Sequence, residues 1–254
     1  MVNNRPGNGR GVGNALTADR ESYLRTADGA MLYDALCVDE PCESLFEIDD
    51  WRQRGAVDLA SGGRGTVAFL SDDRRRWVLR HYKRGGMVAR FLDDSYLWTG
   101  EANTRSFREF RLLWQLTRWQ LPVPPPVAAR YRRTGRFYRA DLITGELPTR
   151  ATLAELLRRA PVPAERWYSV GKCIGRFHAR GVHHADLNAN NILLGSDEVY
   201  LLDFDRGRIR ERGVWEQEVL ERLRRSLQKV TGGGPAGRFG DREWIWLQAG
   251  CRGG

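Results

Sequence analysis

The chain has 254 residues, of which 41% are hydrophobic, and its formal net charge is +9. This length can bury a substantial core, so we expect a folded globule that is one large domain or two lobes. No apolar run approaches the ~20 residues needed to span a bilayer. Residues 1–14 are rich in Gly and Asn, lack the apolar centre of a signal peptide, and are expected to be flexible.

The first candidate site is a glycine-rich turn at residues 61–66, which opens an apolar strand at residues 67–70. Glycines let backbone N–H groups approach phosphate oxygens because no Cβ intervenes. Gly63, Gly65 and Thr66 are therefore predicted to bind a nucleotide. The turn alone is a weak signal, since many β-hairpins contain glycine-rich turns.

The next predicted strand, residues 77–82, carries a basic side chain that could face the nucleotide phosphates. Side chains alternate along a strand, so Val78 and Arg80 share a face and Lys83 points the other way. Arginine stays charged and can bond two phosphate oxygens at once. We predict Arg80 as the phosphate-facing cation, with Lys83 as the alternative.

A helix is predicted at residues 104–119, where apolar side chains recur at helical spacing up to a proline-rich segment. Glu109 is the acid within this helix, and we expect it to orient Arg80. Glu101, just before the helix, is the less favoured candidate. The alternative for Glu109 is a solvated charge among the neighbouring arginines.

Further elements follow in chain order. Residues 127–132 and 137–143 are predicted strands of a small antiparallel sheet that includes the glycine-loop strands, and residues 144–148 are a predicted connector. Thr152 and Glu155 form a capping-box signature at the start of a short helix. The predicted helices of this part are residues 152–157, 164–180 and 214–230.

The most informative stretch begins at His184 and has the spacing of a phosphotransferase catalytic loop. Phosphoryl transfer requires one carboxylate to accept the proton of the acceptor hydroxyl, and an amide and a second carboxylate to hold Mg²⁺ on ATP. Asp186 fits the first role; Asn191 and Asp203 fit the second, because Mg²⁺ prefers hard oxygen ligands. This arrangement indicates a kinase that uses ATP and Mg²⁺.

The two predicted metal ligands lie at the two ends of a predicted β-hairpin, residues 191–194 and 199–202. The alternative is a surface hairpin whose Asp and Asn residues only stabilise turns. The chain after Asp203 is too short for the helices that dock peptides in a protein kinase, so we expect a small acceptor. The arginine clusters would attract polyanions, such as nucleic acid, anionic lipid surfaces or acidic sugars, although scattered arginines are often merely solvated.

These motifs together resemble the bacterial 3-deoxy-D-manno-octulosonic acid (Kdo) kinases of lipopolysaccharide core assembly. The resemblance spans residues 62–225. It rests on Gly63-Arg64-Gly65-Thr66, Leu79-Arg80-His81-Tyr82-Lys83-Arg84-Gly85-Gly86, Arg105-Ser106-Phe107-Arg108-Glu109-Phe110, Leu121-Pro122-Val123-Pro124, the loop from His184 to Leu194, and Leu202-Asp203-Phe204-Asp205.

The resemblance implies an α+β, protein-kinase-like fold of two lobes. The N-lobe, residues 15–145, would hold a small antiparallel sheet, and the reduced C-lobe, residues 146–254, would be mainly helical. Asp186 would be the catalytic base, and Asn191 and Asp203 the metal ligands. Asp205 stands where many kinases have glycine.

The resemblance also implies ATP-dependent phosphorylation of the 4-hydroxyl of Kdo on Kdo-lipid A. The protein would associate peripherally with the anionic cytoplasmic face of the inner membrane, and no nucleic acid or protein partner is expected. Two rival functions remain: an atypical RIO-like protein kinase, and a basic, non-catalytic pseudokinase-like module that binds RNA or anionic lipid.

Overall fold

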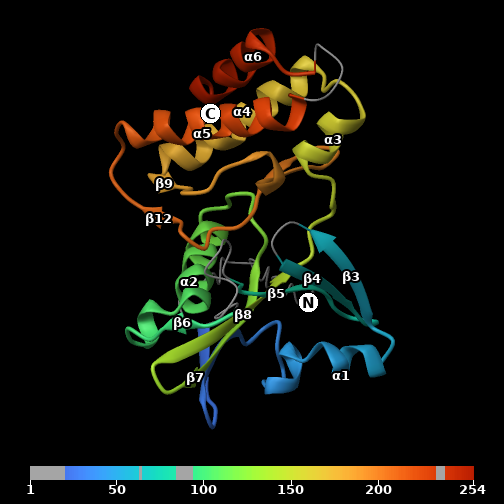
Figure 1. Cartoon of the computed structure of the whole chain (residues 1–254), viewed down its shortest axis with the longest axis vertical. Coiled ribbons are helices and arrows are strands. Elements are labelled where there is room, and N and C mark those ends of the chain that lie inside the picture. Colours follow the sequence, from blue (N-terminus) through green and yellow to red (C-terminus); the bar gives the residue numbers. More distant parts are fainter. Residues whose placement is uncertain (1–20, 63–64, 84–93, 233–237) are drawn as a thin grey trace, which may run out of the picture.

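A computed structural model describes residues 21–62, 65–83, 94–232 and 238–254. Residues 1–14, predicted to be flexible, and the predicted phosphate-binding Gly63 lie outside the described residues. The described part is an α+β structure in which a large sheet occupies one end and helices gather at the other (Figure 1). No helix within these ranges combines the length and apolar character needed to cross a membrane.

The main sheet has eight strands, and every neighbouring pair is antiparallel. The path order is β1-β2-β7-β8-β5-β4-β3, with β6 added beside β8. The sheet is larger than expected, because the sequence did not reveal the β1–β2 hairpin. The strands are β1 (Glu21–Arg25), β2 (Gly29–Asp34), β3 (Val57–Gly62), β4 (Gly65–Ser71), β5 (Arg76–His81), β6 (Tyr96–Leu97), β7 (Pro126–Thr134) and β8 (Phe137–Gly145).

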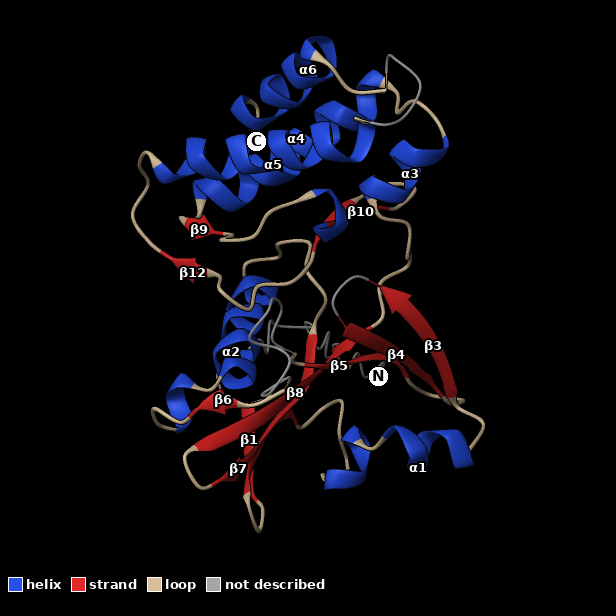
Figure 2. Cartoon of the chain, viewed as in Figure 1, coloured by secondary structure: helices blue, strands red, loops and turns tan. Residues whose placement is uncertain are grey.

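The alternation of side chains along the strands gives the sheet two buried faces. Met31 of β2 belongs to a core that includes Trp51 of α1 (Ile48–Gln53). Its neighbour Leu32 belongs to a second core that includes Phe107 of α2 (Arg105–Arg118) and continues into the helical end. The predicted helix at residues 104–119 is thus confirmed as α2, while α1 was not predicted (Figure 2).

A buried ionic cluster joins the central strands. Arg130 of β7 donates from Nε and Nη2 to Asp141 Oδ2 of β8, at 3.0 and 2.8 Å, and Nδ1 of His81 lies 2.6 Å from Asp141 Oδ1. Burial would raise the pKa of Asp141, but His81 and Arg130 outweigh it and the pKa is lowered. The cluster fixes the end of β5, next to Arg80.

The helical end confirms the predicted helices within one or two residues at each boundary. In α3 the capping box is complete, because Glu155 N–H donates to Thr152 Oγ1 (3.1 Å) and Thr152 N–H donates to Glu155 Oε2 (2.9 Å). Gly181, at φ +68°, follows α4 as the expected left-handed glycine. The last helix was not predicted. These helices are α3 (Leu153–Arg159), α4 (Ala164–Ala179), α5 (Trp215–Thr231) and α6 (Asp241–Arg252).

Two short ladders complete this end of the molecule. One pairs β9 (Val182–His183) with β12 (Arg208–Ile209). The other pairs β10 (Ile192–Leu194) with β11 (Val199–Leu201) and confirms the predicted hairpin. The segment between β9 and β10, which is the predicted catalytic loop, lies on the side of the helices that faces α2 and the sheet (Figure 2).

Candidate active site

The short hairpin brings the two predicted metal ligands together. Leu202 N–H, one residue beyond the β11 ladder, donates to Asn191 O at 2.9 Å. This bond places Asn191 beside the residue that precedes Asp203. Asp203 has φ +65°, a left-handed conformation that Asp tolerates and that is uncommon outside glycine. Such conformations are concentrated at functional sites.

Asp186 is held through its backbone and remains accessible at its side chain. The side-chain amides of Asn188 and Asn191 both donate to Asp186 O, at 2.8 and 3.0 Å. The Asp186 side chain is 38% exposed, so its carboxylate can meet a molecule from solvent. Arg222 of α5 forms an ion pair with Asp186 Oδ1. Sequence reasoning assigned no role to Arg222.

His184 holds the catalytic loop in place through two hydrogen bonds. It is buried, its Nε2 lies 2.8 Å from Leu202 O, and Asp186 N–H donates to its Nδ1 at 3.3 Å. These partners fit a neutral ring that is protonated on Nε2, and burial lowers the pKa of His184 accordingly. Its ring centroid lies 4.7 Å from that of Phe204. His184 thus connects Asp186 to the Asp203 segment.

Arg80 joins the sheet to the hairpin. Its Nη1 donates to Asp203 Oδ1 at 2.6 Å, and its Nη2 forms an ion pair with Glu109 Oε2 of α2. Burial would lower the pKa of Arg80, but the interactions with Glu109, Tyr82 and Asp203 raise it well above its ordinary value. Arg80 therefore stays charged, and it brings together three elements that are far apart in the sequence.

Glu109 is 2% exposed, so the alternative that it is a solvated charge is wrong. Burial raises the pKa of Glu109, and the nearby Arg80 only partly offsets this effect. Its carboxylate also accepts from Tyr82 Oη at 2.5 Å and from Phe204 N–H at 3.1 Å. Sequence reasoning missed Tyr82, although it shares a strand face with Arg80.

The pKa of Asp203 is lowered. Burial alone would raise it, but the charge and hydrogen bond of Arg80 prevail. Asp203 is therefore ionised near neutral pH and can act as an oxygen ligand. Asn191 uses its amide N–H₂ on Asp186 O, which leaves its amide oxygen available. One carboxylate and one amide oxygen suit Mg²⁺, which keeps several waters and usually needs few protein ligands.

Gly65, Thr66 and Lys83 are the other predicted nucleotide-binding residues that the structure describes. Gly65 begins β4 and pairs with Gly62 across the β3–β4 hairpin, with Thr66 next in β4. Val67 pairs with Arg80, so the strand that leaves the glycine-rich turn runs next to β5. Lys83 lies beyond β5, is exposed, and has no ion pair to any residue within the described ranges.

Asp205 is tied to the N-terminal turn of α2. Arg105 Nε donates to Asp205 Oδ1 at 2.5 Å, and the two side chains also form an ion pair through Nη2. The Arg105 guanidinium lies over the ring of Tyr96, 4.6 Å from its centroid. The aspartate found in place of glycine is thus engaged by a specific partner.

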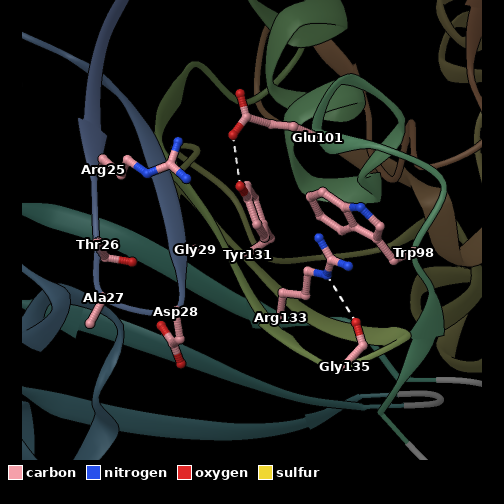
Figure 3. Close-up of a pocket in the computed structure, with 10 residues that line it drawn as sticks. All are labelled: Arg25, Thr26, Ala27, Asp28, Gly29, Trp98, Glu101, Tyr131, Arg133 and Gly135. Carbon is pink, nitrogen blue, oxygen red and sulfur yellow. Dashed lines mark hydrogen bonds between the residues drawn. The ribbon is translucent and has the colours of Figure 1, made fainter.

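Two cavities in the described part of the chain bear on the candidate site. The larger one, about 650 Å³, lies between the β1–β2 and β7–β8 turns (Figure 3). Tyr131 there donates to Glu101 Oε2 at 2.7 Å, so Glu101 is engaged away from Arg80. Apart from Glu101, none of the residues predicted for the site lines this cavity. The smaller one, about 390 Å³, which we call the arginine cavity, is lined by Arg105, Arg108, Ala185, Asp205, Arg206 and Arg208.

Comparison with known proteins gives a consistent result. The model of the lipopolysaccharide kinase (Kdo/WaaP) family matches residues 48–249. The 3-deoxy-D-manno-octulosonic acid kinase of Xanthomonas axonopodis pv. citri is 44% identical over 80% of this chain and 82% of its own length. That of Xanthomonas campestris pv. campestris (strain B100) is 43% identical over 86% of each chain, and that of Vibrio parahaemolyticus is 36% identical over 81% of this chain and 87% of its own.

Proposed function

The chain belongs to the lipopolysaccharide kinase (Kdo/WaaP) family, and from this premise we infer that it phosphorylates Kdo in the biosynthesis of the lipopolysaccharide core. It is therefore a phosphotransferase with an alcohol group as acceptor. Membership of a kinase family implies ATP as the phosphoryl donor. The structural observation that supports this function best is the network in which Arg80 bridges Glu109 and Asp203.

The finer assignment of the reaction is also part of the proposal. The acceptor is Kdo-lipid A, and the phosphoryl group goes to the 4-hydroxyl of Kdo. The fold is protein-kinase-like, with residues 15–145 as one lobe and residues 146–254 as the other. The sheet with α2 at one end, the helices at the other, and Arg80–Asp203 bonding between them support this division.

In the proposed mechanism Asp186 orients the acceptor hydroxyl and accepts its proton as the oxygen attacks the terminal phosphorus of ATP. The bond from that phosphorus to the bridging oxygen of ADP breaks as the new bond forms. Asn188 and Asn191 hold the backbone of Asp186, and His184 links it to the Asp203 segment. The exposure of the Asp186 carboxylate is compatible with a large acceptor.

Asn191 and Asp203 would hold Mg²⁺, which when bound neutralises charge on the ATP phosphates. Within the described ranges no cluster of three or more His, Cys, Asp or Glu side chains could form a metal site by itself. The proposal therefore depends on the amide oxygen of Asn191 together with Asp203 and the substrate phosphates. Arg80 is proposed to offset phosphate charge, with Gly63, Gly65 and Thr66 covering the nucleotide.

We also propose that the protein works as a peripheral protein on the cytoplasmic side of the inner membrane. Its net charge of +9 would attract an anionic lipid surface. We expect the protein to sediment with phosphatidylglycerol vesicles at low salt and to be released from them at high salt. Equal binding to neutral phosphatidylcholine vesicles would contradict an electrostatic association.

The proposed function is tested with purified Kdo-lipid A, Mg-ATP and mass spectrometry, which should detect one added phosphate group. Asp186→Asn should lower the rate of transfer by a factor of about 10³, since general-base catalysis contributes 10²–10⁴. Asp197→Asn, in the exposed turn of the β10–β11 hairpin, is the matched control and should leave the rate unchanged. Full transfer by Asp186→Asn would refute the assigned base.

The same assay separates the rival functions. A RIO-like protein kinase would place the phosphate on the protein itself and leave the lipid unchanged. A non-catalytic binding module would show no ATP turnover, and RNA binding would weaken steeply with salt. The family membership and the names of the relatives favour neither rival.

A further inference from the structure

The arginine cavity combines a strong excess of positive charge with a position next to the proposed catalytic base. Four arginines and one carboxylate line it, and the carboxylate, Asp205, is already paired with Arg105. Ala185, which also lines the cavity, directly precedes Asp186. A group bound in the cavity would therefore lie beside the residue that meets the acceptor hydroxyl.

Three of the arginines form no ion pair with any residue that the structure describes. Arg108, Arg206 and Arg208 are exposed, and no carboxylate among the described residues forms an ion pair with any of them. Their charges are thus available to a ligand. Guanidinium groups bind carboxylate and phosphate oxygens in a planar, two-pronged geometry, which makes arginine well suited to such anions.

The backbone around these arginines is ordered by specific contacts. Arg208 lies in β12, where it pairs with His183 of β9, the residue just before the catalytic loop. Arg206 precedes Gly207, whose N–H donates to Phe204 O at 2.7 Å in a tight turn. The two arginines therefore start from backbone positions that are fixed relative to the loop carrying Asp186.

The cavity is distinct from the proposed nucleotide side of the site. Neither Arg80 nor Glu109 lines it, and neither does any residue of β4. The ATP phosphates are assigned to that other set of residues, so the arginine cavity is left for the second substrate. Kdo is a sugar acid and carries a carboxylate, and lipid A carries phosphates.

We propose that the arginine cavity binds an oxyanion of the acceptor, with Arg206 and Arg208 as its main ligands and Arg108 at its edge. This inference rests on the proposed function and assigns the acceptor-binding residues of the same site. The oxyanion is the Kdo carboxylate or a lipid A phosphate. Its binding would hold the sugar so that a hydroxyl reaches Asp186.

Steady-state kinetics with Kdo-lipid A would test the proposal on Arg206→Gln and Arg208→Gln. Each substitution removes a charge-assisted hydrogen bond, so the KM for the acceptor should rise about tenfold. The KM for ATP and kcat should stay within about twofold of wild type, because the nucleotide side is untouched. Arg159→Gln, an exposed arginine at the end of α3, is the matched control.

Two modified acceptors identify the anion. If the carboxylate is bound, its methyl ester should raise the wild-type KM to that of Arg208→Gln and should raise the variant's KM no further. If a phosphate is bound, it is the acceptor without lipid A phosphates that should raise the wild-type KM to that of Arg208→Gln and leave the variant's KM unchanged. An unchanged acceptor KM in both variants, or an equal rise in the KM for ATP, would overturn the proposal.

Direct binding separates this inference from the proposed function. Kdo-lipid A should quench tryptophan fluorescence of the wild-type protein at lower concentration than that of Arg208→Gln, without ATP. An inactive wild-type protein that still shows this difference would refute the kinase function and support the cavity. An active wild-type protein without the difference would refute the cavity alone. Unchanged thermal midpoints would show that the variants are folded.

Discussion

At the scale of single residues, Glu109 determines how the site is assembled. Its two carboxylate oxygens accept hydrogen bonds from Arg80, Tyr82 and the backbone N–H of Phe204, and the side chain is almost wholly buried. Removing this buried acid leaves Tyr82 and the Phe204 N–H without this acceptor and leaves Arg80 with Asp203 as its one carboxylate partner, which costs more than the original bonds contributed.

Glu109→Ala should lower the free energy of unfolding by about 3 kcal/mol, because it leaves the partly buried Arg80 with only one carboxylate. Urea unfolding followed by tryptophan fluorescence gives this value. Glu21→Ala breaks the exposed ion pair with Arg111 and should cost less than about 0.5 kcal/mol. Equal midpoints for wild type and Glu109→Ala would show that the network does not stabilise the fold.

At the scale of elements, α4 and α6 touch through their backbones. A Cβ at Gly171 would lie 1.9 Å from Leu247 O, and one at Gly250 would lie 2.1 Å from Tyr168 O. Only glycine permits this approach, which lets Trp244 and Leu247 of α6 become buried. α6 thereby covers α4, the helix that leads to the catalytic loop (Figure 1).

Gly171→Ala should destabilise the protein by about 3 kcal/mol, because the new methyl group meets backbone and the helices must move apart. The matched control is Gly213→Ala, where the nearest atom to the new Cβ is 3.8 Å away and the change should be within about 0.5 kcal/mol. Thermal unfolding of the two variants measures both effects. A Gly171→Ala protein as stable as the control would mean that α6 packs differently.

At the scale of the whole molecule, buried histidines link stability to pH. Burial lowers the pKa of His178 to about 4 from an ordinary value of 6.5, and it also lowers the pKa of His183 and His184. The unfolded chain therefore binds protons that the folded protein excludes, and stability falls as the pH drops from about 6.5 to about 4. His81 has the opposite effect. The hydrogen bond to Asp141 raises the pKa of His81, so the stability that protonated His81 contributes is lost as the pH rises.

His178→Gln should reduce this loss of stability. The shift of the His178 pKa corresponds to at most about 3 kcal/mol between pH 7 and pH 4. Urea unfolding at several pH values should show a smaller decline for the variant than for wild type. The same decline in both proteins would mean that burial of His178 does not control acid stability.

The sequence alone determined the parts of the site that local spacing controls. Asn191 and Asp203 flank a short hairpin whose register depends on nearby residues, and the hairpin formed as predicted. The capping box of α3 and the glycine after α4 are likewise local signals. In contrast, α1 and α6 were missed. α1 has only six residues, and the apolar residues 244–247 of α6 form a continuous run rather than a stripe at helical spacing, so both helices depend on their tertiary partners.

Only the tertiary structure decided how distant charges pair. Arg80 and Glu109 are far apart in the sequence, and folding buries Glu109 against Arg80. Lys83, the alternative cation, remains exposed. The bond between Arg222 and Asp186 and the gathering of arginines around Ala185 also join segments far apart in the chain. Periodicity reports which face of an element is buried, whereas long-range packing determines which charged groups meet.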